Sequence, residues 1–313
     1  MSSPTNQNLA APVSQNERII ILDALRGMAI LGILLMNIPG FSLAVPSGWD
    51  PSVLNEAGTI NYKLWYLVEW FPEGTQRAIF SLLYGAGIIL FMKRQEEKLE
   101  GVKPLEYFIR RSLWLMVFGL INAWVLLWWG DILFDYACYG IIMVVFRNLP
   151  VKSLLIGAVV CFLLMVARDN RDLYLEKKVI TRGEQVAAMD TTKVKLTDKQ
   201  KGQLEAMNEF KDKQTHAKKV ERNEKSKQQV TGSYEELYEY RTNNYLGALI
   251  RYLYMSIWDV LFFMFLGMAF LKTGIMTGEA PVKYYWIMAI LGLGLGLLLS
   301  YYRIKPMIQY QFN

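Results

Sequence analysis

The stretch GMAILGILLMNIPGFSLAVPSGW, residues 27–49, holds 23 residues without one charged side chain. About 20 consecutive apolar residues in a helix are enough to cross a hydrocarbon core about 30 Å thick. Two further uncharged runs, 112–130 and 284–302, have 19 residues each. The sequence therefore predicts helices that span a lipid bilayer.

Shorter or interrupted apolar runs add four spans, at about 76–92, 131–146, 152–168 and 246–271. The predicted fold class is all-α: a polytopic transmembrane bundle of about seven spans. The segment INYKLWYLVEWFP, residues 60–72, is too short and too polar for a span, so we expect an interfacial or re-entrant segment there.

Charge divides the chain more sharply than its averages suggest. Hydrophobic residues make up 53% and charged residues 20%, with a net charge of +6. Residues 168–241 hold 17 Lys/Arg and 14 Asp/Glu, whereas the other 239 residues share the remaining 31 charges. We therefore predict a tail over 1–16 that is disordered, a first membrane half over 17–168, a charged helical insert over 169–241 and a second membrane segment over 242–313. Basic and acidic residues alternate in the insert, which argues against nucleic acid as a partner.

The insert is expected to be helical, either as a solvated arm or hairpin or as a coiled coil that binds a partner. Thr197 and Gln200 have the spacing of a helix-capping box. Between residues 203 and 230 no Gly or Pro interrupts the helix.

Short basic loops predict the orientation. Most of the charged residues in the loop at 44–75 are acidic. Three other connections carry the basic residues Lys93, Arg94, Lys98, Lys103, Arg110, Arg111, Arg147, Lys152, Lys272 and Lys283. The positive-inside rule then places the basic loops and the N-terminus in the cytoplasm. The loop at 44–75 and the insert would lie on the opposite side of the membrane.

The few cysteines and the one histidine of the sequence argue against a disulfide framework and a zinc site. Cys138 and Cys161 both lie in apolar runs, and His216, the one histidine, lies in the insert. Their spacing builds neither a disulfide framework nor a zinc site, so no metal is predicted. The sequence also has no nucleotide-binding loop, HExxH or GxSxG motif.

Polar residues inside spans are costly and are therefore candidates for function. Asp23 and Arg26 are three residues apart, and Asn37 lies on nearly the same helix face about 16 Å deeper. Asn122 lies at a similar depth beyond Arg110 and Arg111, and Asp259 lies 13 residues before Lys272. We expect Asn37, Asn122 and Asp259 to form a shared polar cluster, although amides also hydrogen-bond helices together without any further role.

The outer ends of two spans carry a second set of candidates. Asp131 follows two tryptophans at a tight turn, where it is either a functional acid or the N-cap of the next helix. Glu73 and Arg77 are spaced for an i, i+4 pair. Five glycines in spans are predicted to allow close helix contact: Gly85, Gly87, Gly292, Gly294 and Gly296.

Four motifs resemble the YeiB-like family of bacterial membrane proteins. They are LDALRGMAILGILLMNI (22–38), EGTQRAIFSLLYGAGIILF (73–91), RRSLWLMVFGLINAWVLLWWGDILFDYACYG (110–140), and GSYEELYEYR (232–241) followed by LFFMFLGMAFLKTGIMTG (261–278). That family is similar in turn to the transmembrane acyltransferase superfamily, which moves acyl groups from acyl-CoA to acceptors across the membrane. The resemblance also implies further spans after residue 313, so we expect this chain to be a C-terminally truncated form.

Two departures bear on the activity that the resemblance implies. Asn37 stands where the first helix of the acyltransferase superfamily has a histidine, and Asn122 stands where many YeiB-like sequences have one. The amide of an asparagine is no general base at neutral pH. Under the acyl-transfer hypothesis, Arg26, Arg110 and Arg111 would bind acyl-CoA as co-substrate, and Asp259 or Asp131 would replace the base. The remaining candidates, Asp23, Asn37, Glu73, Arg77 and Asn122, would bind the substrate.

Two other functions remain open from the residues. A transporter for a small polar metabolite or lipid head group fits a polar cluster at mid-membrane depth. A scaffold that uses the insert is the third hypothesis. The sequence leaves the oligomeric state open.

Overall fold

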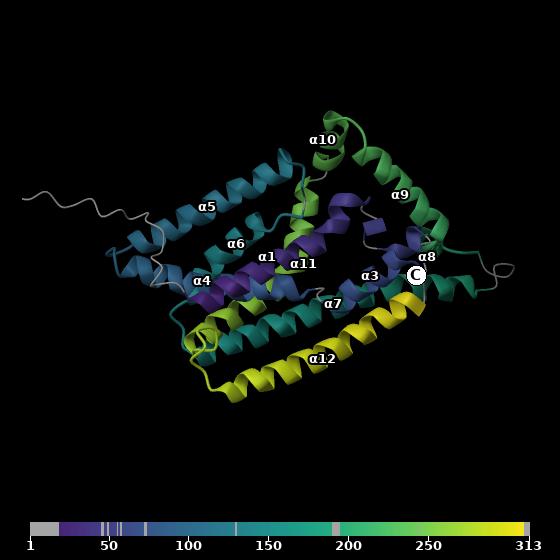
Figure 1. The fold of residues 1–313 in the computed structure, drawn as a ribbon. Coiled ribbons are helices and arrows are strands. Elements are labelled where there is room, and N and C mark those ends of the chain that lie inside the picture. Colours follow the sequence, from purple (N-terminus) through teal and green to yellow (C-terminus); the bar gives the residue numbers. More distant parts are fainter. Residues whose placement is uncertain are drawn as a thin grey trace, which may run out of the picture. The chain divides into compact units, whose positions relative to one another are not determined.

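The computed structural model describes residues 19–44, 47–48, 50–54, 56, 58–71, 74–128, 130–189, 195–243 and 245–309. In this part of the chain every regular element is helical, as Figure 1 shows. The elements are α1 (Ile20–Ser42), η2 (Pro51–Leu54), α3 (Ile60–Trp70), α4 (Thr75–Glu96), α5 (Lys103–Trp124), α6 (Leu133–Met143), η3 (Val144–Phe146), α7 (Val151–Ala187), α8 (Asp198–Gln214), α9 (His216–Val230), α10 (Tyr234–Thr242), α11 (Tyr245–Lys272) and α12 (Val282–Gln309).

Five stretches of the chain are long and apolar enough to cross a bilayer: Ile20–Ser42, Ile60–Glu96 (which includes the separate helices α3 and α4), Val151–Ala187, Tyr245–Lys272 and Val282–Pro306. These segments indicate a membrane protein in a lipid bilayer. The segment Leu133–Phe146 is apolar but shorter, and α5 carries several charges near its start. The predicted total of seven spans therefore stays a prediction. The predicted tail over 1–16 lies outside the described residues.

Helix boundaries differ from the predicted runs at two places. Helix α1 begins at Ile20, so Asp23 and Arg26 lie within it, and it ends at Ser42 rather than near residue 49. Pro39 lies in its last turn, where a residue that has no N–H favours helix termination. Helix α7 continues for 37 residues to Ala187, well past the predicted end of the span at 168, and it includes Gly183 without ending there.

The chain divides into two compact units. The first comprises residues 1–34, 74–161 and 249–287, and the second comprises 35–73, 162–248 and 288–313. Helices α1, α7, α11 and α12 contribute to both, and each unit is described by itself below.

The first unit has a core of apolar side chains from α4, α5, α6, α7 and α11. Helices α4 and α11 cross at two glycines: a Cβ on Gly85 would lie 2.2 Å from the Met264 carbonyl oxygen, and a Cβ on Gly267 would lie 2.0 Å from that of Leu82. Both contacts are with backbone, so only glycine fits there. The predicted close contact is confirmed at Gly85.

The other glycine predictions fare differently. Among the described residues, a Cβ on Gly87 would meet no atom within 4 Å, so close contact at this residue is not confirmed. The same holds within the described chain for three glycines of α12, Gly292, Gly294 and Gly296, so close contact at these positions is not confirmed.

Contacts in the first unit fix the helix directions. Arg77 of α4 contacts Asp259 of α11, and further along both helices Gly85 lies against Met264, so these helices run parallel. One end of the unit gathers their C-terminal ends with the start of α7: Arg147 donates to Glu96 at 3.0 Å, and Lys272 donates to the Leu149 carbonyl at 2.7 Å. The predicted basic loops therefore meet at one end of this unit. Which side of the membrane this end faces stays a prediction.

In the second unit, α3 packs against α12. Arg303 of α12 forms a 2.8 Å ion pair with Glu69 of α3 and also donates to the Glu69 carbonyl at 2.9 Å. The indole of Trp70 donates to the Leu297 carbonyl at 3.2 Å. Helix α3 is thus a packed helix, and its predicted interfacial position stays a prediction.

The charged segment after α7 forms helices α8, α9 and α10. The predicted capping box is confirmed: Thr197 accepts from the Gln200 N–H, and the Gln200 side chain accepts from the Thr197 N–H. The prediction of one unbroken helix over 203–230 is wrong. The chain turns at Thr215, which is extended and whose hydroxyl accepts from the Lys218 N–H as the N-cap of α9. The helix is therefore interrupted by the capping hydroxyl of Thr215, without a Gly or Pro.

One face of α9 is buried against the connection that follows α1. Lys219 is 4% exposed and pairs with Asp50 at 3.1 Å. The Asn223 side chain accepts from the Ser47 N–H at 3.1 Å. The segment is therefore held to the connection at 47–54 rather than fully solvated on this face.

Replacing Lys219 by methionine should loosen this contact by about 2 kcal/mol, because Asp50 loses a charged partner in a mostly buried setting. Hydrogen exchange of residues 47–54 and of α9 would measure the loss of protection. Lys218→Met is the matched control, since Lys218 pairs with Glu221 on the exposed face of the same helix and should change little. Equal exchange in both variants would contradict the buried role of Lys219.

Candidate functional site

An ion pair between an exposed arginine and a mostly buried aspartate joins two helices of the first unit. Nη2 of Arg77, in the first turn of α4, lies 2.5 Å from Oδ2 of Asp259 in the middle of α11. The Asp259 side chain is 13% exposed and the Arg77 side chain is 46% exposed. Because buried charges are stable only when paired, this contact is the strongest candidate for a site in the described chain.

The pair lies deep in the apolar region. Asp259 precedes Lys272, at the basic end of α11, by 13 residues, which is about 20 Å of helix. Asp259 is 9% exposed, and Val260, Leu261 and Met264, which follow it in α11, are buried as well. Ionisable groups at such depth mark functional positions more often than structural ones.

Tyr136 of α6 holds the α4 end of the site. Its side chain is buried, and its hydroxyl shares a 2.6 Å hydrogen bond with the Ser81 hydroxyl. Ser81 donates to the Arg77 carbonyl at 2.7 Å, and Tyr136 approaches the same carbonyl at 3.5 Å. Two hydroxyl groups therefore fix the first turn of α4, from which the Arg77 side chain extends.

Tyr139, one turn further along α6, does the same for α11. Its hydroxyl lies 2.9 Å from the Ser256 hydroxyl and donates to the Leu253 carbonyl at 3.2 Å. Ser256 in turn donates to the Tyr252 carbonyl at 2.9 Å. The Tyr252 phenol lies within hydrogen-bonding reach of Arg77. Helix α6 thus ties together the two helices that carry the ion pair.

Two acids of α6 and the turn before it complete the site. Asp131 accepts from the Leu133 N–H at 3.3 Å through Oδ1, which supports a capping role for this residue. Its Oδ2 is buried and has no hydrogen-bond partner in the described chain. Asp135, in the first turn of α6, is 3% exposed and faces Arg77 and Tyr252.

The structure brings together only some of the predicted residues. Asp23 and Arg26 form the predicted pair, at 2.9 Å and exposed. Arg77 contacts Asp259, whereas its predicted partner Glu73 lies outside the described residues. Asn37 and Asn122 are half-buried, in the second and first units respectively, and the shared cluster with Asp259 stays a prediction.

The two arginines of α5 lie on the basic half of that helix. Arg110 is exposed and lies 4.0 Å from Glu106, and the Arg111 guanidinium lies over the Phe91 ring at 5.5 Å from its centroid. Phe91 belongs to the C-terminal part of α4, so both arginines are near the end where the basic loops meet. Their predicted role with acyl-CoA remains a prediction.

The sequence analysis missed the hydroxyl groups of the site: Ser81, Tyr136, Tyr139 and Ser256. Their signal was weak, because serine and tyrosine are common in apolar helices. Ser81 follows Arg77 by four residues, and Ser256 follows Tyr252 by four residues. This spacing indicates that both serines bind tyrosines of α6 only when the position of α6 beside α4 and α11 is known.

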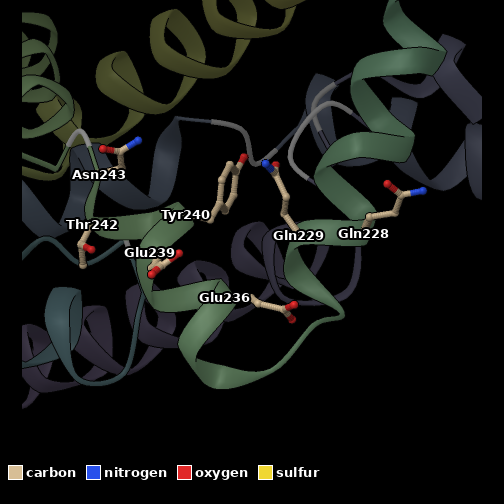
Figure 2. Close-up of a pocket in the computed structure, with 7 residues that line it drawn as sticks. All are labelled: Gln228, Gln229, Glu236, Glu239, Tyr240, Thr242 and Asn243. Atoms are coloured by element: carbon tan, nitrogen blue, oxygen red, sulfur yellow. The ribbon is translucent and has the colours of Figure 1, made fainter.

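The described residues contain no group of three His, Cys, Asp or Glu side chains arranged to hold a metal ion. The described structure does have a polar pocket of about 690 Å³ in the second unit, between the end of α9 and α10 (Figure 2). Gln229 and Tyr240 face each other across it, and Glu236 lies at its edge. Glu236 caps α10 by accepting from the Ser233 N–H at 2.7 Å, so this carboxylate already has a structural role.

Comparison with known proteins gives uncharacterised relatives. The chain is 37% identical over 157 residues to the uncharacterised protein YxaH of Bacillus subtilis (strain 168), a match that covers 49% of this chain and 38% of that protein. It is 32% identical over 149 residues to the uncharacterised protein YeiB of Escherichia coli (strain K12), covering 47% and 36%. An uncharacterised 39.9 kDa protein of Bacillus acidopullulyticus is 35% identical over 139 residues, covering 44% and 36%.

No family model and no solved structure matches the chain. The matched stretches cover well under half of the length of these relatives. The homologues of this chain, over about half of its length, thus include the uncharacterised proteins YxaH and YeiB.

Proposed function

We propose that this membrane protein transfers an acyl group from acyl-CoA to an acceptor held at the Arg77–Asp259 pair. The observation that carries the proposal is this 2.5 Å ion pair. The hydroxyl groups of Ser81 and Tyr136 lie close to it, and the pair is far along α11 from Lys272, where the basic loops meet. A reaction whose donor and acceptor enter from opposite sides of a membrane needs such a two-ended arrangement.

At the basic end, arginines would bind the donor. Guanidinium groups match phosphate geometry, and Arg26, Arg110 and Arg111 all carry exposed side chains. The start of α1 lies beside the end of α11, since Ile21 approaches Gly278. Arg26 therefore lies near the same end as the two arginines of α5.

At the other end, the acceptor hydroxyl or amine would attack the thioester carbonyl. A new C–O or C–N bond forms, the C–S bond breaks, and coenzyme A leaves as a thiol after taking up the proton that the acceptor loses. Asp259 or Asp131 would carry that proton, and Arg77 would stabilise the negative charge that develops on the acyl oxygen. Asn37 and Asn122 would orient the substrate.

Labelled acyl-CoA tests this proposal. The purified protein in lipid nanodiscs should bind it and transfer the label to a lipid-linked or soluble hydroxyl or amine. Arg26→Ala should weaken binding about tenfold, the loss expected for one charge-assisted hydrogen bond to phosphate. If Arg26→Ala binds acyl-CoA as tightly as the unaltered protein, Arg26 does not bind the donor. If the unaltered protein binds no acyl-CoA at all, acyl-CoA is not the donor.

A second function is transport of a small polar metabolite or lipid head group. It is favoured by the half-buried amides Asn37 and Asn122, since an amide binds polar groups but is no general base. Vesicle counter-flow separates the two functions: flux that is lost in Asp259→Asn, without any acylated product, would support transport. An acylated product without flux would reject it.

The proposed location is the bacterial cytoplasmic membrane, with the N-terminus and the basic loops in the cytoplasm. Accessibility of single cysteines to a membrane-impermeant reagent tests this orientation. A cysteine at Lys98 should be protected in intact cells, and a cysteine at Glu224 should be labelled. The opposite pattern would invert the topology.

A further inference from the structure

We propose that Asp135, which has no role in the functions above, is the proton-carrying carboxyl of the site. The inference deepens the proposed function and rests on it: in acyl transfer Asp135 would hold the acceptor's proton after Asp259 or Asp131 has accepted it, and in transport it would bind the coupling proton. Its test below needs neither activity.

Two carboxyl groups of the first unit differ in their contacts. Asp259 is held in an ion pair with Arg77. Asp135 is 3% exposed, and no hydrogen bond or ion pair to its side chain is present in the described chain. A fixed cation keeps a carboxylate charged, whereas a buried carboxyl without a partner is most stable in its neutral, protonated form. Asp135 is therefore the group that can take up and release a proton without breaking an ion pair.

Charged and titratable groups surround Asp135 on each neighbouring helix. Arg77 of α4 and Tyr252 of α11 lie close enough to interact with it electrostatically. The same holds for Asp131, Cys138 and Tyr139 of its own segment. Arg77 is the one cation in this set, and Asp259 already holds it. A negative charge on Asp135 would compete with Asp259 for the same guanidinium.

Asp131 differs from Asp135 in its contacts. Oδ1 of Asp131 accepts a backbone N–H at the start of α6, so this carboxyl already has a capping role. Asp131 also lies close enough to Asp135 to act on it as a like charge. Two neighbouring carboxyl groups hold a proton between them more readily than either alone. Asp135 is the member of the two that lies within α6 and is 3% exposed.

The test uses dicyclohexylcarbodiimide, an apolar reagent that adds a protonated carboxyl across its C=N bond. The adduct rearranges to a stable N-acylurea, and no atom leaves. The full chain in nanodiscs is treated at neutral pH, digested and mapped by mass spectrometry, with fragment ions that distinguish positions 131 and 135. We expect modification at Asp135 and at least tenfold less at Asp259, because the ion pair keeps Asp259 charged.

Variants make the result decisive. Asp135→Asn should abolish the modification and Asp135→Glu should keep it, which controls for folding. Arg77→Gln should make Asp259 reactive. Modification of Asp131 or Asp259 in the unaltered chain, with Asp135 untouched, would overturn the proposal, and so would absence of any modification in this region. Acyl transfer or transport that fails while Asp135 is modified would instead count against the proposed function alone.

Discussion

Replacing Arg77 by methionine should lower the free energy of unfolding by about 4 kcal/mol. The substitution leaves the carboxylate of Asp259, only 13% exposed, without its cation. Removal of one partner of a buried ion pair typically costs about 3–5 kcal/mol, since the remaining charge stays buried and uncompensated. Unfolding of the purified protein by denaturant in mixed micelles would measure the change.

The double variant Arg77→Met/Asp259→Leu identifies the cause. It removes both charges, so it should recover most of the stability that the single substitution loses. Arg26→Met is the matched control, because Arg26 pairs with Asp23 at 2.9 Å with both side chains about half exposed, and exposed pairs contribute about 0–1 kcal/mol. If the double variant were as unstable as Arg77→Met, the loss would come from packing of the arginine and not from the stranded charge.

The sequence predicted the helical membrane class well, because long apolar runs have few alternatives. It also identified Asp259 and Arg77 as candidate residues, since charges are expensive in apolar segments. It did not predict that they meet. The i, i+4 spacing predicted that Arg77 pairs with Glu73, four residues away. In the structure Arg77 pairs with Asp259, 182 positions later. Local spacing describes contacts within one helix and contains no information on which helices become neighbours.

The fold of the charged segment shows the same limit. The capping box at Thr197 was predictable because it depends on four consecutive residues. The break at Thr215 was missed, since a threonine in a polar sequence has the same pattern whether it caps a helix or lies within one. The docking of α9 on residues 47–54 through Lys219 and Asn223 was hidden for another reason: a lysine in a charged run is normally solvated.

The glycine pattern GAG at 85–87 allows the sharpest test of helix packing. Substituting valine for Gly85 should lower the free energy of unfolding by about 3 kcal/mol. Its Cβ would lie 2.2 Å from the carbonyl oxygen and 2.7 Å from the Cα of Met264, so α4 and α11 would have to move apart. Overpacking of this kind typically costs about 1–3 kcal/mol, and a clash with backbone belongs at the upper end because no side chain can rotate away.

Gly87→Val is a control two residues along the same helix. A Cβ there meets no atom within 4 Å, so the change should stay within about 0.5 kcal/mol, as for other unpacked positions. Both variants replace glycine by the same β-branched residue in the same helix, and therefore intrinsic helix propensity cancels in the comparison. Equal losses in the two variants would mean that α4 and α11 do not cross at Gly85.

The same pair of variants connects packing to the site. Gly85 lies two helical turns from Arg77 on α4, and Met264 lies five residues from Asp259 on α11. Because the two helices run parallel from the ion pair to the glycine crossing, separation at Gly85 should also lengthen the Arg77–Asp259 contact. Gly85→Val should therefore make Asp259 reactive toward dicyclohexylcarbodiimide, as Arg77→Gln does, whereas Gly87→Val should leave it protected. Loss of stability in Gly85→Val without new reactivity at Asp259 would show that the ion pair is held by the hydroxyl ties of α6 alone.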